Sequence, residues 1–206
     1  MLKVKSFLLG DISTNCYVLY SDSTKNAVVI DIAEKGGEEI TNWLTQNGIN
    51  PIAIMLTHGH FDHCGGVKQF NDKLELPIYI HKADADMCEN ASKYTIGGIK
   101  ADDCIATKTF NIEDGMLSVG EFNFRIIHTP GHTPGSVCYI IDEYMFSGDT
   151  LFCGCIGRTD FERGNLQDMK KSISKIKNIN INYKVYPGHD DFTTLDDEKK
   201  YNIWLR

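Results

Sequence analysis

The chain has 206 residues, of which 42% are hydrophobic and 24% charged, and its formal net charge is −7. These values are typical of one folded domain with a substantial core, and the acidic balance argues against nucleic acid or an anionic membrane as a partner. The apolar run at the N-terminus is too short for a signal peptide, and no run is long enough to cross a bilayer.

The seven cysteines are an odd number without the spacing of a disulfide framework. This usage fits a reducing compartment, so we expect a cytoplasmic protein. Cys153 and Cys155 form the closest pair, and we interpret them as small packing residues, because no other cysteine pair completes a metal site around them.

The first half of the chain predicts strands and then helices. Short turns separate the first three apolar stretches, which indicates an antiparallel start to a sheet. An amphipathic helix should bury Trp43 with its neighbours and stop at Asn47-Gly48. Two more helices are expected, at 67–70 and 83–89. Strands are predicted at 2–9, 15–20, 27–30, 52–56 and 77–80.

Two polar residues at strand ends in this half are interpreted as structural. Asp31 is expected to end a strand or cap a loop, as short acidic side chains often do. His81 has no possible partner near it in the sequence, which favours a structural or surface histidine. The least patterned stretch, 90–108, is of the length and irregularity that favour a lid over a site.

The second half repeats the order of strands followed by a helix. Asn165 is predicted to cap a helix over 166–177, and Thr193 or Thr194 to cap a last helix that contains Tyr201 and Trp204. The repetition indicates two halves, each with a sheet inside and helices outside. Strands are predicted at 110–112, 115–120, 122–127, 137–141, 144–146 and 182–186.

The stretch Thr57-His58-Gly59-His60-Phe61-Asp62-His63 follows a buried strand and holds three histidines and one carboxylate. Imidazole and carboxylate together suit zinc, iron or manganese, and the carboxyl end of a strand is where α/β sheets place their sites. On a loop, alternate residues can point to one place. His58 and His60 are therefore predicted to share one metal, with Asp62 and His63 aimed at a second.

Three later turns each add one residue of a metal-binding type, bracketed by Gly or Pro: His132, Asp149 and His189. With the first motif, this ordered set resembles the metallo-β-lactamase superfamily, whose pattern is His-x-His-x-Asp-His followed by a distant His, an Asp and a last His. The resemblance runs from about Phe7 to the C-terminus. It implies an α/β (α+β) fold: a single-domain, four-layer αβ/βα sandwich of two mixed sheets with helices outside.

The resemblance also implies a role for each ligand. His58, His60 and His132 would hold one divalent ion, Asp62, His63 and His189 would hold the other, and Asp149 would bridge them. Zinc is the first expectation for both ions, and iron and manganese accept the same ligands. With only one metal, Asp62 would be the catalytic base. His128 matches no ligand position and is expected to close a strand.

Four further stretches resemble the glyoxalase II-like branch of the superfamily. That branch implies hydrolysis of a small thioester, such as an S-2-hydroxyacylglutathione, by a metal-bridging hydroxide. The chain stops at Arg206, so we expect the single-domain form without the C-terminal helical domain that helps hold glutathione. The stretches are 128–136, 147–152, 156–161 and 186–198.

Arg158, inside the third of these stretches, is the candidate to bind a substrate carboxylate or a lid, and an ion pair with Asp160 or Glu162 is the structural alternative. Two other functions stay open. A persulfide dioxygenase would use His58, His132 and Asp149 to hold one iron. A non-catalytic metal-sensing or redox-sensing module would use the pair Cys153 and Cys155.

Overall fold

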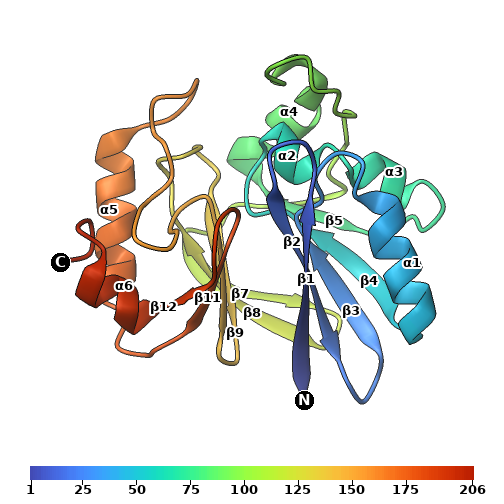
Figure 1. Ribbon diagram of the computed structural model, residues 1–206, viewed down its shortest axis with the longest axis horizontal. Coiled ribbons are helices and arrows are strands. Elements are labelled where there is room, and N and C mark those ends of the chain that lie inside the picture. Colours follow the sequence, from blue (N-terminus) through green and yellow to red (C-terminus); the bar gives the residue numbers. More distant parts are fainter. The chain divides into compact units, whose positions relative to one another are not determined.

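The computed structural model describes residues 1–206 and contains two six-stranded sheets, each built from consecutive strands of the chain. The chain divides into two compact units, 1–110 and 111–206, and each unit holds one of the sheets with its own helices (Figure 1). Two mixed sheets with helices are the α+β class that the sequence predicted.

The sheet of the first unit keeps the order of the chain. Its first three strands pair antiparallel, as predicted, and the remaining pairings are parallel. The parallel part brings the carboxyl ends of β3, β4 and β5 to one edge of the sheet, which is where the polar motif leaves β4. The strands are β1 (Leu2–Leu9), β2 (Thr14–Ser21), β3 (Asn26–Ile30), β4 (Asn50–Met55), β5 (Ile78–His81) and β6 (Lys108–Phe110).

Helix α1 (Gly37–Asn47) packs its buried Ile40 and Leu44 into the core of this unit and ends, as predicted, at Gly48, which has a φ of 61°. Trp43 is only partly buried: its ring packs edge-on against Phe7 and Tyr20, at the border of the core. The other helical segments are short. They are α2 (Phe61–Cys64), α3 (Val67–Asn71), α4 (Ala85–Cys88) and the 3₁₀ turns Lys82–Asp84 and Ala91–Lys93.

Two predictions for this unit need correction. The polar motif was expected to be a loop throughout, but Phe61–Cys64 is a helical turn, closed by the bond from the Cys64 N–H to the His60 carbonyl. A single turn carries no periodicity that a sequence pattern could reveal. The strand predicted at 110–112 lies earlier, as β6, because Lys108 and Thr109 pair with Tyr79 and Ile80 of β5.

The second unit has the strand order β12-β11-β10-β9-β8-β7. All neighbours are antiparallel except β10 and β11, which are joined by a crossover through α5 and pair parallel. The carboxyl ends of β10 and β11 therefore share one edge. The strands are β7 (Asp114–Val119), β8 (Phe122–His128), β9 (Val137–Ile141), β10 (Tyr144–Gly148), β11 (Lys184–Pro187) and β12 (Thr193–Thr194).

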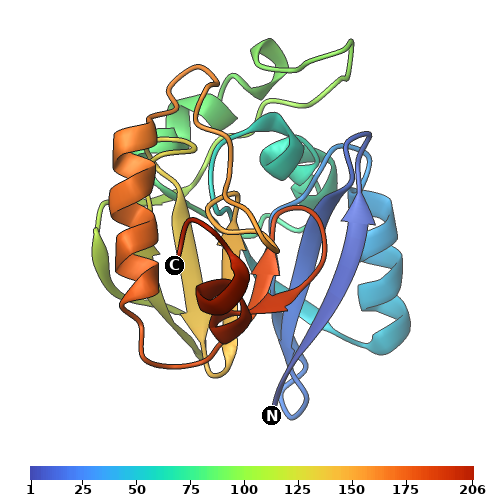
Figure 2. The same cartoon turned by 60° about the vertical axis from the view of Figure 1, so that its left-hand side comes forward.

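Two helices belong to this sheet, α5 (Leu166–Lys177) and α6 (Leu195–Tyr201) (Figure 2). Asn165 caps α5, as predicted, by accepting hydrogen bonds from the N–H groups of Gln167 and Asp168. Thr194 caps α6, and Trp204 lies beyond its end. The buried face of α5 joins the core of the unit with side chains of β8, β9 and β10.

None of the helices is both long and apolar enough to cross a membrane. All seven cysteines are free thiols.

Candidate metal centre

Four candidate ligands of the first unit follow β4, two on the loop and two on α2. His58, Asp62 and His63 are almost completely buried, with 1%, 5% and 0% of their surface exposed. The Nε2 atom of His58 lies 3.0 Å from the Nδ1 atom of His60, so the two rings aim nitrogens at the same place. The alternate residues His58 and His60 thus lie close together, and their sharing of one metal stays a prediction.

Asp31, at the end of β3, holds this motif in place. Its Oδ1 accepts a hydrogen bond from the Thr57 N–H at 2.8 Å, and its Oδ2 accepts one from the Thr57 hydroxyl at 2.8 Å. The same Oδ2 accepts a bond from His63 Nδ1 at 2.9 Å. The predicted loop-capping role is therefore present, but the contact with His63 was not anticipated. Buried carboxylates that bind the outer nitrogen of a histidine are a recurring part of metal sites.

The bond to Asp31 decides which nitrogen of His63 can bind a metal. Nδ1 carries the hydrogen, so Nε2 presents its lone pair, and it lies 3.2 Å from Asp62 Oδ2. A lone pair opposite a carboxylate oxygen is repulsive unless a cation or a proton lies between them. This buried donor set therefore fits a metal ion.

Thr57 sets the tautomer of His58 in the same way. Its hydroxyl hydrogen goes to Asp31, which leaves an oxygen lone pair to accept the His58 Nδ1–H at 3.1 Å. The lone pair of His58 is then on Nε2, the atom that faces His60. A chain of hydrogen bonds that begins at Asp31 thus directs both His58 and His63.

The second unit brings its three candidate ligands together around one carboxylate. Asp149 Oδ2 lies 3.3 Å from His132 Nε2 and 3.7 Å from His189 Nε2. Asp149 follows β10 and His189 follows β11, so the parallel pairing of these strands places them side by side. One carboxylate oxygen between two imidazole nitrogens again fits a bound cation.

His132 is oriented by a main-chain contact that the sequence could not reveal. Its Nδ1–H donates to the carbonyl oxygen of Arg158 at 2.8 Å, which leaves Nε2 as the ligand atom. The turn that supplies this carbonyl packs directly on Asp149: a Cβ added at Gly157 would lie 1.7 Å from the Asp149 carbonyl oxygen. Only glycine fits there without moving the backbone.

Helix α5 also holds the turn that carries His132. The Asn165 N–H donates to the Gly131 carbonyl at 2.8 Å, and the Ser172 hydroxyl donates to the Pro130 carbonyl at 2.7 Å. A Cβ at Gly131 would lie 2.5 Å from the main chain of Met169, so the turn touches the helix backbone. The position of His132 is therefore tied to the packing of α5.

The side chain of Arg158 has the structural partner that the sequence offered as an alternative. It forms a two-pronged ion pair with Asp160, at 2.9 and 2.8 Å, and its guanidinium lies 4.1 Å from the ring centre of Phe161. The pair lowers the pKa of Asp160 below its ordinary value. Both side chains are more than 60% exposed, so the pair contributes little stability. Its role toward a substrate stays a prediction.

Two histidines outside the ligand set have structural roles, in line with the sequence analysis. His128 is the last residue of β8, and its Nε2 donates to the Pro134 carbonyl at 2.8 Å. His81 Nδ1 accepts the Ala83 N–H at 3.3 Å and so caps a 3₁₀ turn. The lid predicted over 90–108 has only one 3₁₀ turn before β6, and its function also stays a prediction.

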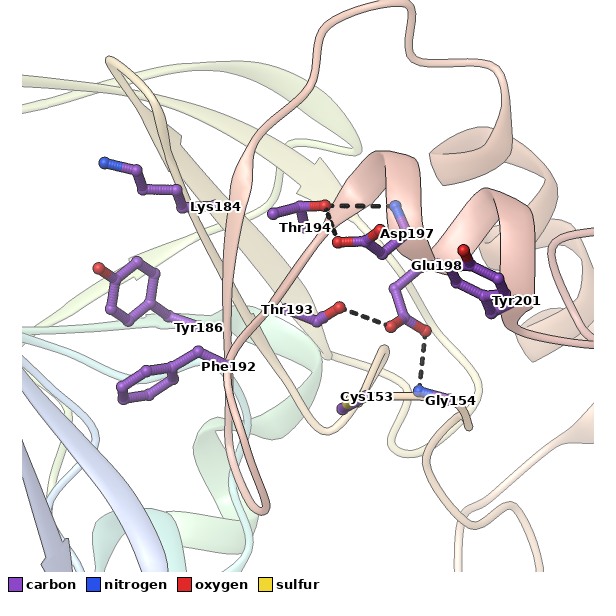
Figure 3. A pocket seen from close by; sticks show the side chains of 10 residues that line it. All are labelled: Cys153, Gly154, Lys184, Tyr186, Phe192, Thr193, Thr194, Asp197, Glu198 and Tyr201. Carbon is purple, nitrogen blue, oxygen red and sulfur yellow. Dashed lines mark hydrogen bonds between the residues drawn. The ribbon is translucent and has the colours of Figure 1, made fainter.

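A pocket of about 580 Å³ lies in the second unit, beside the strand that leads to His189. Figure 3 shows the rings of Tyr186 and Phe192 on one side of it and the carboxylate of Glu198 on the other. The ring centres are 4.9 Å apart. Glu198 is buried and accepts hydrogen bonds from the Thr193 hydroxyl, the Gly154 N–H and the Asn202 amide. The carboxylate thus joins α6 to the 153–155 turn.

These features define a class of protein. A family model of the metallo-β-lactamase superfamily matches residues 9–189, and the chain belongs to this superfamily. Among curated relatives, the probable metallo-hydrolase YqgX of Bacillus subtilis is 32% identical over 99% of this chain and 98% of its own. The hydroxyacylglutathione hydrolase GloC of Haemophilus influenzae is 35% identical over 93% of this chain and 92% of its own.

Solved structures agree with this assignment. The crystal structure of BLEG-1 B3 metallo-β-lactamase has a TM-score of 0.90 and 37% identity and covers 98% of this chain and 99% of that one. The structure of TTHA1623 in a di-iron-bound form has a TM-score of 0.86 and 31% identity, and it covers 97% of this chain and 99% of that one. The predicted fold is confirmed, and the family is one of metal-dependent hydrolases.

Proposed function

We propose that this protein is a metal-dependent thioester hydrolase of the glyoxalase II type, whose substrate is a small hydroxyacyl thioester. The observation that carries the proposal is the complete ligand order, held within each unit by dedicated hydrogen bonds. The resemblance to a hydroxyacylglutathione hydrolase, at 35% identity over more than 90% of both chains, supports the same reaction class.

In this proposal the seven candidate ligands act in the order of the family pattern. By that pattern, His58, His60 and His132 would hold one ion, Asp62, His63 and His189 would hold the other, and Asp149 would be shared. The order of the seven residues in the family pattern and the tautomers set by Asp31 and by the Arg158 carbonyl support this assignment. Every donor is a nitrogen or a carboxylate oxygen, as zinc, iron and manganese accept.

Zinc stays the first expectation, because it binds such sites more tightly than iron or manganese in the Irving–Williams order. The relative described as di-iron-bound keeps iron open as the second. When bound, such ions polarise a carbonyl group and ionise water at neutral pH.

In this proposal the residues of the chain position the ligands and select the substrate. Asp31 and Thr57 hold His63 and His58 in the ligand tautomer, and the Arg158 carbonyl does the same for His132. The Arg158 guanidinium is proposed to exchange Asp160 for a carboxylate of the substrate, because that ion pair is exposed and weak. A thiolate leaves without being protonated, so the site needs no separate acid for this bond.

The test combines metal analysis with release of thiol from S-lactoylglutathione and from an acyl-coenzyme A. About two ions per chain with turnover of either thioester is the expected result. Asp149→Asn should abolish turnover, whereas the matched control Asp142→Asn, an exposed carboxylate in the turn between β9 and β10, should keep it. One iron per chain with oxygen uptake on glutathione persulfide would instead identify a persulfide dioxygenase.

The similarity to BLEG-1 B3 metallo-β-lactamase, at 37% identity, supports a second candidate function, the hydrolysis of a β-lactam amide. Amide cleavage must deliver a proton to the leaving nitrogen, and thioester cleavage need not. A chromogenic cephalosporin, assayed beside the thioesters on one preparation, decides between the two. Faster turnover of the lactam would make lactamase activity the function.

We also propose that the protein acts in the cytoplasm on a small molecule, with neither nucleic acid nor membrane as partner. Seven free thiols and the net charge of −7 support this setting. Fractionation of cells that produce the native protein tests it. Recovery with membranes or with nucleic acid would contradict it.

A further inference from the structure

Three cysteines from separate segments meet in the core of the first unit. Cys64 ends α2, Cys88 ends α4 and Cys104 lies in the irregular stretch before β6. Their Sγ atoms all lie within 4.8 Å of one another, and no more than 4% of each residue is exposed. None of the three belongs to the ligand set described above.

The main chain, rather than chance side-chain rotamers, holds these segments together. The Cys104 N–H donates to the Cys88 carbonyl at 2.9 Å, and the Asp102 N–H donates to the Gly65 carbonyl at 3.2 Å. The Cys64 sulfur lies 3.6 Å from the Gly59 carbonyl oxygen. The cluster is therefore a fixed feature of the fold.

The spacing suits a metal ion. A Zn–S bond of about 2.3 Å places three sulfurs around one ion about 4 Å from each other. The sulfurs lie within 4.8 Å of one another, so binding requires them to close in by about 0.8 Å at most. Sulfur ligands select thiophilic ions such as Zn²⁺ and Cu⁺ over magnesium or calcium.

We propose that Cys64, Cys88 and Cys104 form a three-sulfur site for one thiophilic metal ion, distinct from the histidine and carboxylate centre. Zn²⁺ and Cu⁺ share the chemistry that this site recognises, and the experiment below separates them. The proposal uses no residue of the hydrolytic centre as a ligand, so it stands or falls independently of the proposed function.

Two further features support this site. The pKa of Cys88 is raised by its hydrogen bond with Cys104 and by burial, and the negative charge of buried Asp84 adds to this rise. The same charge favours a cation among the sulfurs. The pKa of Cys104 is lowered to about 4, because the thiols of Cys64 and Cys88 donate hydrogen bonds to its sulfur.

The experiment uses the full chain loaded with zinc, in a background in which Cys153→Ser and Cys155→Ser remove the exposed thiols. Cd²⁺, as a spectroscopic stand-in for Zn²⁺, and chelator-buffered Cu⁺ are added separately. We expect one further ion per chain and a thiolate-to-metal charge-transfer band, which nitrogen and oxygen ligands do not give. A band with one ion and not the other identifies the metal.

Cys88→Ala/Cys104→Ala in the same background should lose both the band and the extra ion. Cys16→Ala, which removes a buried thiol of the same core outside the cluster, should keep both. Circular dichroism and the melting temperature show that each variant is folded. A folded parent that gives no band with either ion, or a double variant that keeps the band, would overturn the site.

If the double variant does not fold, the single variants Cys88→Ala and Cys104→Ala replace it. Each should bind the added ion more weakly than the parent, and unchanged binding in both would equally overturn the site. The hydrolytic activity is not a readout here, so failure of this site and failure of the proposed function are told apart.

Discussion

Asp31 shows how much one buried side chain contributes to the first half of the site. It accepts three hydrogen bonds, from the main chain and hydroxyl of Thr57 and from His63. Its φ of 54° is unusual for a residue other than glycine, and such strain persists only where the surroundings enforce it. The residue that looked like a strand terminator thus positions two histidines.

The first prediction concerns this residue. Asp31→Asn should reduce metal affinity by about 10- to 100-fold, because the amide cannot hold His63 and Thr57 in the same hydrogen-bonded form. Isothermal titration with Zn²⁺ measures the change. Asp11→Asn removes an exposed carboxylate that pairs only at the surface with Lys35, and it should leave the affinity unchanged.

A second prediction concerns Gly157. Gly157→Ala places a methyl group against the Asp149 carbonyl, so the turn must move, at a cost of about 1–3 kcal/mol or more. Chemical denaturation should show the loss of stability, and metal content should fall with it. Gly115→Ala is the control, because its nearest contact would be an ordinary 3.4 Å. Equal stability of both variants would contradict the close approach.

At the scale of elements, α6 is attached both by Leu195, which lies in the apolar core, and by a buried polar bridge. Glu198 reaches from this helix to the 153–155 turn and to β12, with Asn202 bonded to the same carboxylate. Buried polar groups of this kind stabilise only while every partner is present. Glu198, Thr193 and Gly154 all line the pocket of Figure 3, so this bridge forms part of its wall.

The third prediction follows from that bridge. Glu198→Ala should lower the free energy of unfolding by about 1–3 kcal/mol, because the Gly154 N–H and the Thr193 hydroxyl lose a buried acceptor. Urea denaturation gives the value. Asp196→Ala, on the exposed first turn of the same helix, should change it by less than about 0.5 kcal/mol. A similar loss in both variants would assign the effect to helix charge instead.

At the scale of the whole molecule, the proposed centre predicts that metal binding stabilises the fold. Removal of the metal with a chelator should lower the melting temperature, since an ion that binds only the folded state at 100 times its Kd contributes about 2.7 kcal/mol. Differential scanning calorimetry of both forms measures this. Asp149→Asn should melt at nearly the same temperature with and without the chelator. An identical shift in this variant would place the stabilising ion elsewhere.

Much of the fold could be predicted from the sequence, because its signals are local. The Asn165 cap and the Gly48 stop are chemical signals, and both were confirmed. The helical turn Phe61–Cys64 could not be predicted, since four residues are too few for periodicity. The pairing of β6 with β5 is a contact between distant segments, for which no single stretch gives a sign.

The candidate site, like the fold, could be predicted only in part from the sequence. Residue types and the family pattern predicted seven ligands, and the structure brings these candidates together within their own units: His58 near His60, His63 near Asp62, and both His132 and His189 near Asp149. The assembly of one centre from both sets stays a proposal. The contribution of the Arg158 carbonyl to His132 could not be foreseen, because every residue type has a carbonyl.

The attachment of the His132 turn to α5 has a consequence for how such a protein can change over time. The helix backbone touches Gly131, and Ser172 bonds to Pro130, so a small shift of α5 moves a ligand. Substitutions of Met169, Ile173 or Ile176 would then retune reactivity from the far side of the core, without altering any group that meets the substrate. Laboratory evolution toward a new substrate should therefore accumulate changes along this inner face as readily as among the candidate ligands.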